Sequence, residues 1–151
     1  MAVVVGDGTQ RHSLDRLAEQ LGVARYVRIT GLVQHSEVKN YMRMADVFMS
    51  LYDLSNRGNP LLEAMVHGRC IVTINDGSVS DLIVDGQTGM LVEPGDIDDG
   101  LPKILVRLLK DGDMRRQLGE AARLRAHEKL MTVEERMGAE VEAIERLARN
   151  S

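Results

Sequence analysis

The sequence predicts a three-layer α/β/α protein, with helices on both faces of a parallel β-sheet. Short β-branched apolar runs alternate along the chain with segments whose apolar residues recur at helical spacing. This alternation of short strands and helices is typical of parallel sheets that are buried on both faces. With 151 residues and 44% apolar content, the chain is long enough for one core. We therefore expect a single domain over residues 1–151, ending in C-terminal helices over residues 113–150.

In the first half of the chain, each predicted strand leads into a turn or an amphipathic helix. Residues 13–21 repeat apolar side chains three and four positions apart, and Gly22 follows where a helix end is expected. Ser36 is a suitable N-cap for the next helix. The expected elements, in order, are strand 2–5, helix 13–21, strand 26–31, helix 36–44 and strand 45–51.

The second half of the chain begins with a strong helix signal and ends in about fifty helical residues. Asn59 is a good N-cap, Pro60 suits the first helical position, and Gly68 closes the segment. The expected elements, in order, are helix 59–67, strands 70–74 and 89–92, and helices 97–109, 114–130 and 133–148.

Composition excludes several classes of function. The formal charge of −4 and an aromatic content of 3% argue against a nucleic-acid partner, because such proteins need basic surfaces and stacking rings. A single cysteine, Cys70, excludes an internal disulfide, and it opens an apolar strand where we expect it to be buried. No run approaches the ~18 apolar residues of a membrane span, and the first residues carry no basic leader, so we expect a soluble, cytoplasmic protein.

Neither the histidines nor the acidic cluster after residue 95 has the spacing of a metal site. No two of the four histidines stand four residues apart, and an EF-hand loop starting at Asp96 would require glycine at Leu101 and glutamate at Arg107. The acidic residues suit a helix N-terminus instead. We therefore expect no metal site and no cofactor.

Two segments of the sequence have the features of ligand-binding loops. Gly6-x-Gly8 follows the first strand, but Arg11 stands where a dinucleotide fingerprint needs a third glycine, so a tight turn is the simpler interpretation. A helix that starts at Asn59, just past a parallel strand, is a natural anion site. Glu63 lies one turn inside it, where its carboxylate either complements the helix dipole or accepts two ribose hydroxyls.

Five segments in order resemble the C-terminal, donor-binding domain of the retaining GT-B enzymes called glycosyltransferase group 1. The segments are VVVGDG at 3–8, VRITGLV at 27–33, ADVF at 45–48, LLEAM at 61–65 with Gly68, and DGQTGMLV at 85–92. The resemblance implies a Rossmann-like sheet and a nucleoside-diphosphate sugar as donor substrate. It also implies transfer with retention of anomeric configuration and without an essential metal.

The resemblance also assigns nucleotide-sugar-binding residues by position. Glu63 would bind the ribose hydroxyls, and backbone amides at the helix start would hold the diphosphate. The base would lie beside the backbone of Val33, at a mouth that also includes Gly8. The amides at the helix start belong to Gly58, Asn59 and Leu61, because Pro60 has no N–H.

The chain departs from the family pattern in two ways. Ser55 occupies the place of a glutamate that usually contacts the transferred sugar, and a strand with a basic phosphate-binding region would precede Met1. The acceptor-binding domain would also precede Met1. We therefore expect a fragment that is inactive alone and partnered by that missing domain, whose full-length protein could also meet the inner membrane surface.

Two alternatives stay open from the sequence. Ser55 and Pro60 favour a non-catalytic binding or regulatory module that keeps the same fold. The second alternative is an unrelated flavodoxin-like or receiver domain: Asp7 and Asp53 stand near the acidic positions of receiver domains, but no lysine follows strand 70–74.

The absent unit also predicts how the chain assembles. Without a strand between them, strands 2–5 and 45–51 are expected to pair directly and give a five-stranded parallel sheet. Met137, Val141 and Ile144 form an apolar stripe on the last helix, which we expect to be partly exposed and to mediate a homodimer through the C-terminal helices.

Overall fold

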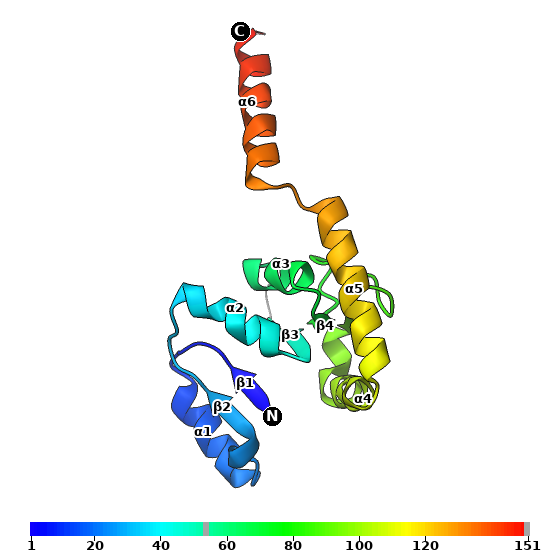
Figure 1. Ribbon diagram of the computed structural model, residues 1–151. Coiled ribbons are helices and arrows are strands. Elements are labelled where there is room, and N and C mark those ends of the chain that lie inside the picture. Colours follow the sequence, from blue (N-terminus) through cyan, green and yellow to red (C-terminus); the bar gives the residue numbers. More distant parts are fainter. Residues whose placement is uncertain (53–54, 150–151) are drawn as a thin grey trace. The chain divides into compact units, whose positions relative to one another are not determined.

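The computed structural model describes residues 1–52 and 55–149, and it shows an α/β fold in which parallel strands are flanked by helices (Figure 1). Within it the chain divides into two compact units, Met1–Ala45 and Asp46–Ser151. Each unit contains its own parallel sheet. Asp53, named above for the receiver alternative, lies outside the described residues.

The first unit is a two-stranded parallel sheet with helices. Val3 lies opposite Arg28 in the pairing of β1 with β2. Helix α2 begins one residue earlier than expected, with Gln34 rather than Ser36 as its N-cap, because the Gln34 N–H donates to Glu37 Oε2 at 3.2 Å. The elements are β1 (Ala2–Val4), α1 (Arg11–Gln20), η1 (Ala24–Tyr26), β2 (Val27–Ile29) and α2 (His35–Met44).

The second unit contains a three-stranded parallel sheet in the order β3-β4-β5, followed by the C-terminal helices. The elements are β3 (Val47–Ser50), α3 (Asn59–Val66), β4 (Cys70–Ile74), β5 (Met90–Val92), η2 (Pro94–Asp96), α4 (Ile97–Lys110), α5 (Gly112–Lys129) and α6 (Val133–Arg149). The observed strands and helices match the predicted ones within about two residues, as local patterning allows.

The core of the second unit lies on both faces of β4, whose five residues are all buried. Cys70 and Val72 pack with Leu108 of α4 and Leu118 of α5 on one face. Side chains alternate along a strand, so Ile71 and Thr73 point to the other face. Helix α3 contributes the fully buried Leu61, Ala64 and Met65 and contacts both β3 and β4. The position of α3 is thus fixed by burial.

The expected five-stranded sheet is wrong. Among the described residues, β1 pairs only with β2, and β3 pairs only with β4, so two separate sheets form. A direct pairing of β1 with β3 would crowd the helices that follow these two strands, which is a steric reason for the split.

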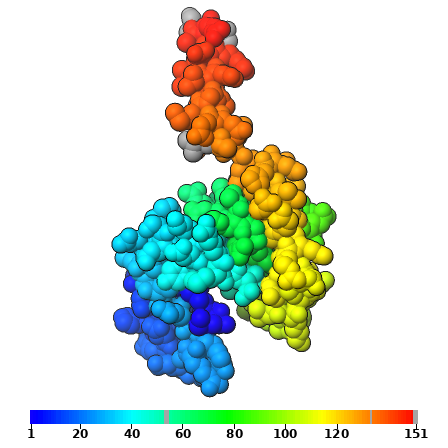
Figure 2. All heavy atoms as spheres, viewed as in Figure 1, coloured from blue at the N-terminus to red at the C-terminus, as the bar shows by residue number. Residues whose placement is uncertain are grey.

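Helix α6 has an exposed apolar stripe. The exposed fractions are 59% for Met137, 53% for Val141 and 66% for Ile144, all in the orange-to-red segment of Figure 2. The exposure expected from the sequence is confirmed. No helix among the described residues has both the length and the apolar character needed to cross a membrane.

Candidate functional site

The candidate site of the second unit lies at the carboxyl edge of its sheet. Residues 51–58 connect β3 to α3, and residues 75–89 connect β4 to β5. Because parallel strands end at the same edge, these two connections come together there. Binding sites of open α/β sheets form at such edges, so these loops carry the candidate site.

Asn56 lies in the connection between β3 and α3 and forms several hydrogen bonds within it. Its side chain is fully buried, and Asn56 Oδ1 accepts from Ser50 Oγ at 3.1 Å and from the Tyr52 N–H at 2.8 Å. Asn56 Nδ2 donates to the Tyr52 carbonyl oxygen at 3.0 Å. The side-chain amide of Asn56 thus links the loop by a hydrogen bond to Ser50, the last residue of β3.

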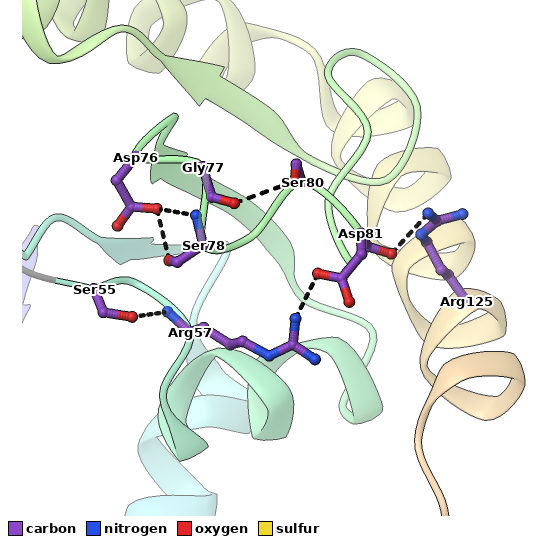
Figure 3. A network of polar contacts seen from close by, with 8 residues as sticks. All are labelled: Ser55, Arg57, Asp76, Gly77, Ser78, Ser80, Asp81 and Arg125. Atoms are coloured by element: carbon purple, nitrogen blue, oxygen red, sulfur yellow. Dashed lines mark hydrogen bonds and ion pairs between the residues drawn. The ribbon is translucent and has the colours of Figure 1, made fainter.

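Asp76, in the connection that follows β4, accepts hydrogen bonds from the same loop. Asp76 Oδ2 accepts from the Asn56 N–H and from Asn56 Nδ2, both at 2.9 Å. Asp76 Oδ1 accepts from Ser78 Oγ at 2.6 Å and from the Ser78 N–H at 2.8 Å, as Figure 3 shows. The bond from the Ser78 hydroxyl and those from Asn56 lower the pKa of Asp76 to about 2, because they favour the ionised carboxylate.

A second link between the two connections runs through Asp81. The Arg57 guanidinium donates to Asp81 Oδ1, and Arg125 of α5 donates to the Asp81 carbonyl oxygen at 2.8 Å (Figure 3). The hydrogen bond and the charge of Asp81 raise the pKa of Arg57, and Arg57 lowers the pKa of Asp81. Arg57 and Asp81 are both exposed, so this pair contributes little to stability.

The N-terminus of α3 is open toward solvent at Asn59. Gly58 is the N-cap, rather than the expected Asn59, and its N–H donates to the Asn56 carbonyl oxygen at 3.0 Å. The Gly58 carbonyl oxygen accepts from the N–H of Leu61 at 3.0 Å and of Leu62 at 3.3 Å. Asn59 is exposed in the first turn, where helix N–H groups have no partner within the helix, and Pro60 has no N–H. The Asn59 N–H is therefore the one best placed for an anion, whereas the Leu61 amide is already bonded and its side chain is buried.

Glu63 lies on α3, one turn from its start, and is half-buried. Among the described residues, no lysine or arginine pairs with its carboxylate, unlike the carboxylates of Asp81 and Glu120. A carboxylate without a cation beside it keeps its lone pairs for hydroxyl donors. The geometry thus leaves Glu63 available for a polar ligand.

The remaining predicted residues divide between the two units. Ser55 is exposed in the second unit, and Ser55 Oγ accepts from the Arg57 N–H at 3.3 Å. Gly8 and Val33 lie in the first unit, in the connections that follow β1 and β2. The Gly8 N–H donates to Asp7 Oδ1 at 2.8 Å.

Arg11 connects these two turns of the first unit. Arg11 Nη1 donates to Asp7 Oδ2 at 3.4 Å, and Arg11 Nη2 donates to the Ile29 carbonyl oxygen at 3.5 Å. Gly31 has φ +74°, a backbone conformation that residues with a Cβ rarely adopt. A Cβ there would also come within 2.8 Å of Arg11 Nη1, but this nitrogen is the end of a flexible side chain and can move, so the backbone conformation is the reason for glycine at 31.

Sequence reasoning missed Asn56 and Asp76. They stand twenty residues apart, and no periodic pattern connects them. The one available signal was their position in the sequence, since each lies in a connection that follows a parallel strand, and such strands end at the same edge of the sheet. Within the described part of the chain, no group of three or more His, Cys, Asp or Glu side chains could hold a metal ion.

Relatives of this chain in sequence are glycosyltransferases. LpsE of Rhizobium meliloti, a lipopolysaccharide core biosynthesis glycosyltransferase, is 29% identical over 85% of this chain and 36% of its own length. The sulfoquinovosyl transferase SQD2 of Arabidopsis thaliana is 32% identical over 79% of this chain and 23% of its own length. This chain thus spans about a third or less of the length of these relatives.

The fold has close counterparts among solved structures. Anabaena HepE in complex with UDP-glucose superposes with a TM-score of 0.82 at 23% identity, over 95% of this chain and 40% of that one. This similarity shows a GT-B glycosyltransferase fold and excludes the receiver alternative. The family described as "Glycosyl transferases group 1" matches residues 1–125, which is most of the chain. The chain therefore belongs to the group 1 glycosyl transferase family.

Proposed function

We propose that this chain is the donor-binding half of a retaining glycosyltransferase and binds a nucleoside-diphosphate sugar. The observation that carries the proposal is the Glu63 carboxylate, which has no cation partner among the described residues and lies one turn inside the open N-terminus of α3. An anion-binding helix end beside a free carboxylate suits a ligand with both phosphates and hydroxyls. Membership of the family and the complexes of the structural neighbour HepE with UDP and with UDP-glucose support the same class of ligand.

In the proposed complex, each part of the site has a separate task. The Asn59 N–H and the positive end of the α3 dipole would hold the diphosphate. The Glu63 carboxylate would accept hydrogen bonds from two ribose hydroxyls.

The same arrangement would assist the transfer reaction. When the glycosidic bond to the donor phosphate breaks, negative charge develops on the leaving diphosphate. N–H dipoles that already point at this position stabilise that charge without reorganising. The acceptor would bind to a further domain of the full-length protein, so we expect this chain alone to bind the donor without turnover.

Titration of the isotopically labelled chain with UDP, GDP and ADP tests the binding step. We expect NMR shifts at Gly58, Asn59 and Glu63, with an affinity of about 1 mM. Shifts confined to α5 and α6 would contradict the proposal.

Glu63→Gln is the sharpest test of the proposed ribose contact. Loss of the charge weakens nucleoside-diphosphate binding by about tenfold, since hydrogen bonds to charged groups are the strong ones. The free energy of unfolding falls by about 1 kcal/mol or less, because the carboxylate is half-exposed and unpaired. Parallel titration and urea unfolding measure both quantities.

The matched control is Glu128→Gln, which makes the same chemical change at an exposed position of α5. It should alter neither quantity. A large loss of stability in Glu63→Gln with unchanged nucleotide affinity would assign Glu63 to folding instead.

A further inference from the structure

We propose that Asn56 and Asp76 are positioning residues of the donor site, which hold residues 55–59 so that the open end of α3 meets the diphosphate. This inference rests on the function proposed above and adds two residues to it. Neither residue belongs to the segments that carry the family resemblance. Their role follows from the hydrogen bonds of the loop itself.

The contacts of Asp76 show that it acts on the protein rather than on a ligand. A carboxylate offers about four lone pairs. Asp76 uses them for four donors, namely the N–H and Nδ2 of Asn56 and the N–H and Oγ of Ser78. No acceptor capacity remains for a sugar hydroxyl, and a negative charge here would repel a phosphate. Asp76 therefore contributes through Asn56.

Asn56 is equally saturated and is fully buried. Its Oδ1 accepts two hydrogen bonds, and its Nδ2 donates two, to Tyr52 and Asp76. A buried amide with all four bonds satisfied has one allowed position, because any displacement leaves a polar group unpaired. The Asn56 backbone is thus fixed relative to both β3 and the loop after β4.

Two successive sets of backbone hydrogen bonds connect Asn56 to the start of α3. The Asn56 carbonyl oxygen accepts from the Gly58 N–H, and the Gly58 carbonyl oxygen accepts from Leu61 and Leu62. Asn59 is thereby held between a fixed loop and the first helical bond. The body of α3 is anchored separately, through Leu61, Ala64 and Met65 in the core. Weakening the Asn56–Asp76 bonds should disturb the phosphate end of the site more than Glu63.

This separation gives the inference its test, which compares UDP with uridine. In Asp76→Asn, an amide N–H₂ replaces one acceptor oxygen and faces N–H donors. We expect NMR titration to show UDP binding about tenfold weaker, while the weaker binding of uridine changes by less than about twofold. A residue needed only for folding would reduce both affinities together.

Two further variants complete the experiment. Ser78→Ala removes one of the four donors to Asp76 and should weaken UDP binding by about threefold. This variant tests the positioning role even if Asp76→Asn does not fold. Asp85→Asn is the matched control, because its carboxylate also accepts a backbone N–H, from Leu91 at 2.8 Å, outside the loop before α3. It should leave UDP binding unchanged.

The outcomes separate this inference from the proposed function. If the unaltered chain fails to bind UDP, the proposed function fails and this inference fails with it. If the unaltered chain binds UDP and the folded Asp76→Asn and Ser78→Ala variants bind it equally well, only the positioning role is overturned. Equal losses for UDP and uridine would also overturn it.

Discussion

At Ser55 a hydroxyl occupies the place where the family resemblance implies a carboxylate that contacts the transferred sugar. Its position in the loop before α3 is exposed, so a longer side chain can be accommodated. If the chain is a donor-binding domain, Ser55→Glu should strengthen binding of UDP-glucose relative to UDP by about threefold or more, through new hydroxyl contacts. Titration with both ligands measures the ratio.

The same change at Ser80 serves as the control, because Ser80 is also exposed in a nearby loop. Ser80→Glu adds an equal charge and should lower the affinity for both ligands slightly without changing their ratio. An unchanged ratio in Ser55→Glu would favour the non-catalytic module instead of a transferase.

The lowered pKa of Asp76 predicts how the stability of the chain depends on pH. Its pKa is lowered to about 2 in the folded chain, chiefly by the Ser78 hydroxyl and by Asn56, against an ordinary value of 3.8. The stabilisation by this carboxylate is therefore complete above about pH 4 and is lost as the pH falls toward 2. In urea unfolding, the difference in stability between the unaltered chain and Asp76→Asn should shrink over this range. A difference that stays constant from pH 6 to the acid limit would contradict this assignment.

At the scale of elements, the contact between α5 and the turn after α3 depends on two glycines. Gly68, with φ +62°, ends the turn, and Gly119 of α5 lies directly against its carbonyl oxygen. A Cβ on Gly119 would overlap the Gly68 backbone, which cannot move aside as a side chain can. Helix α5 would have to shift away from α3 and β4, both of which it contacts.

Gly119→Ala should therefore destabilise the chain by about 1–3 kcal/mol, as overpacking of a core does, although alanine is the better helix former. Gly138→Ala is the control, because Gly138 is also helical and has no neighbour within 4 Å of the added Cβ. It should be neutral or slightly stabilising. Thermal unfolding followed by circular dichroism compares the two, and equal melting temperatures would show that α5 adjusts without cost.

At the scale of the whole molecule, the exposed stripe of α6 bears on oligomeric state. Met137, Val141 and Ile144 are each more than half exposed, and such apolar patches tend to acquire partners. We predict a two-fold dimer at micromolar concentration, with twice the 16.8-kDa mass of one chain in light scattering. Ile144→Lys should return the chain to monomers.

The control is Val106→Lys, which places the same charge on an exposed apolar residue of α4, outside the stripe. It should leave the mass unchanged. A monomeric unaltered chain would contradict the prediction, and a dimer that survives Ile144→Lys would place the interface elsewhere.

Local patterning was sufficient to predict most elements. The spacing of apolar residues located the helices, and Asn59-Pro60 located the start of α3 to within one residue. The N-cap of α2 was misassigned. Serine is the more common N-cap residue, which favoured Ser36, but Gln34 has a glutamate, Glu37, three residues further on that accepts a hydrogen bond from its backbone N–H.

The sequence by itself determined that Glu63 lies one turn inside a helix that follows a strand. This placement depends only on helical period and on the start signal at Asn59-Pro60, both of which are local. Only the tertiary structure decided that the strands form two sheets and that Asp76 reaches Asn56 from twenty residues away. Both outcomes depend on which backbone and side-chain groups find partners across the fold, and burial enforces that choice because an unpaired polar group inside the protein is costly.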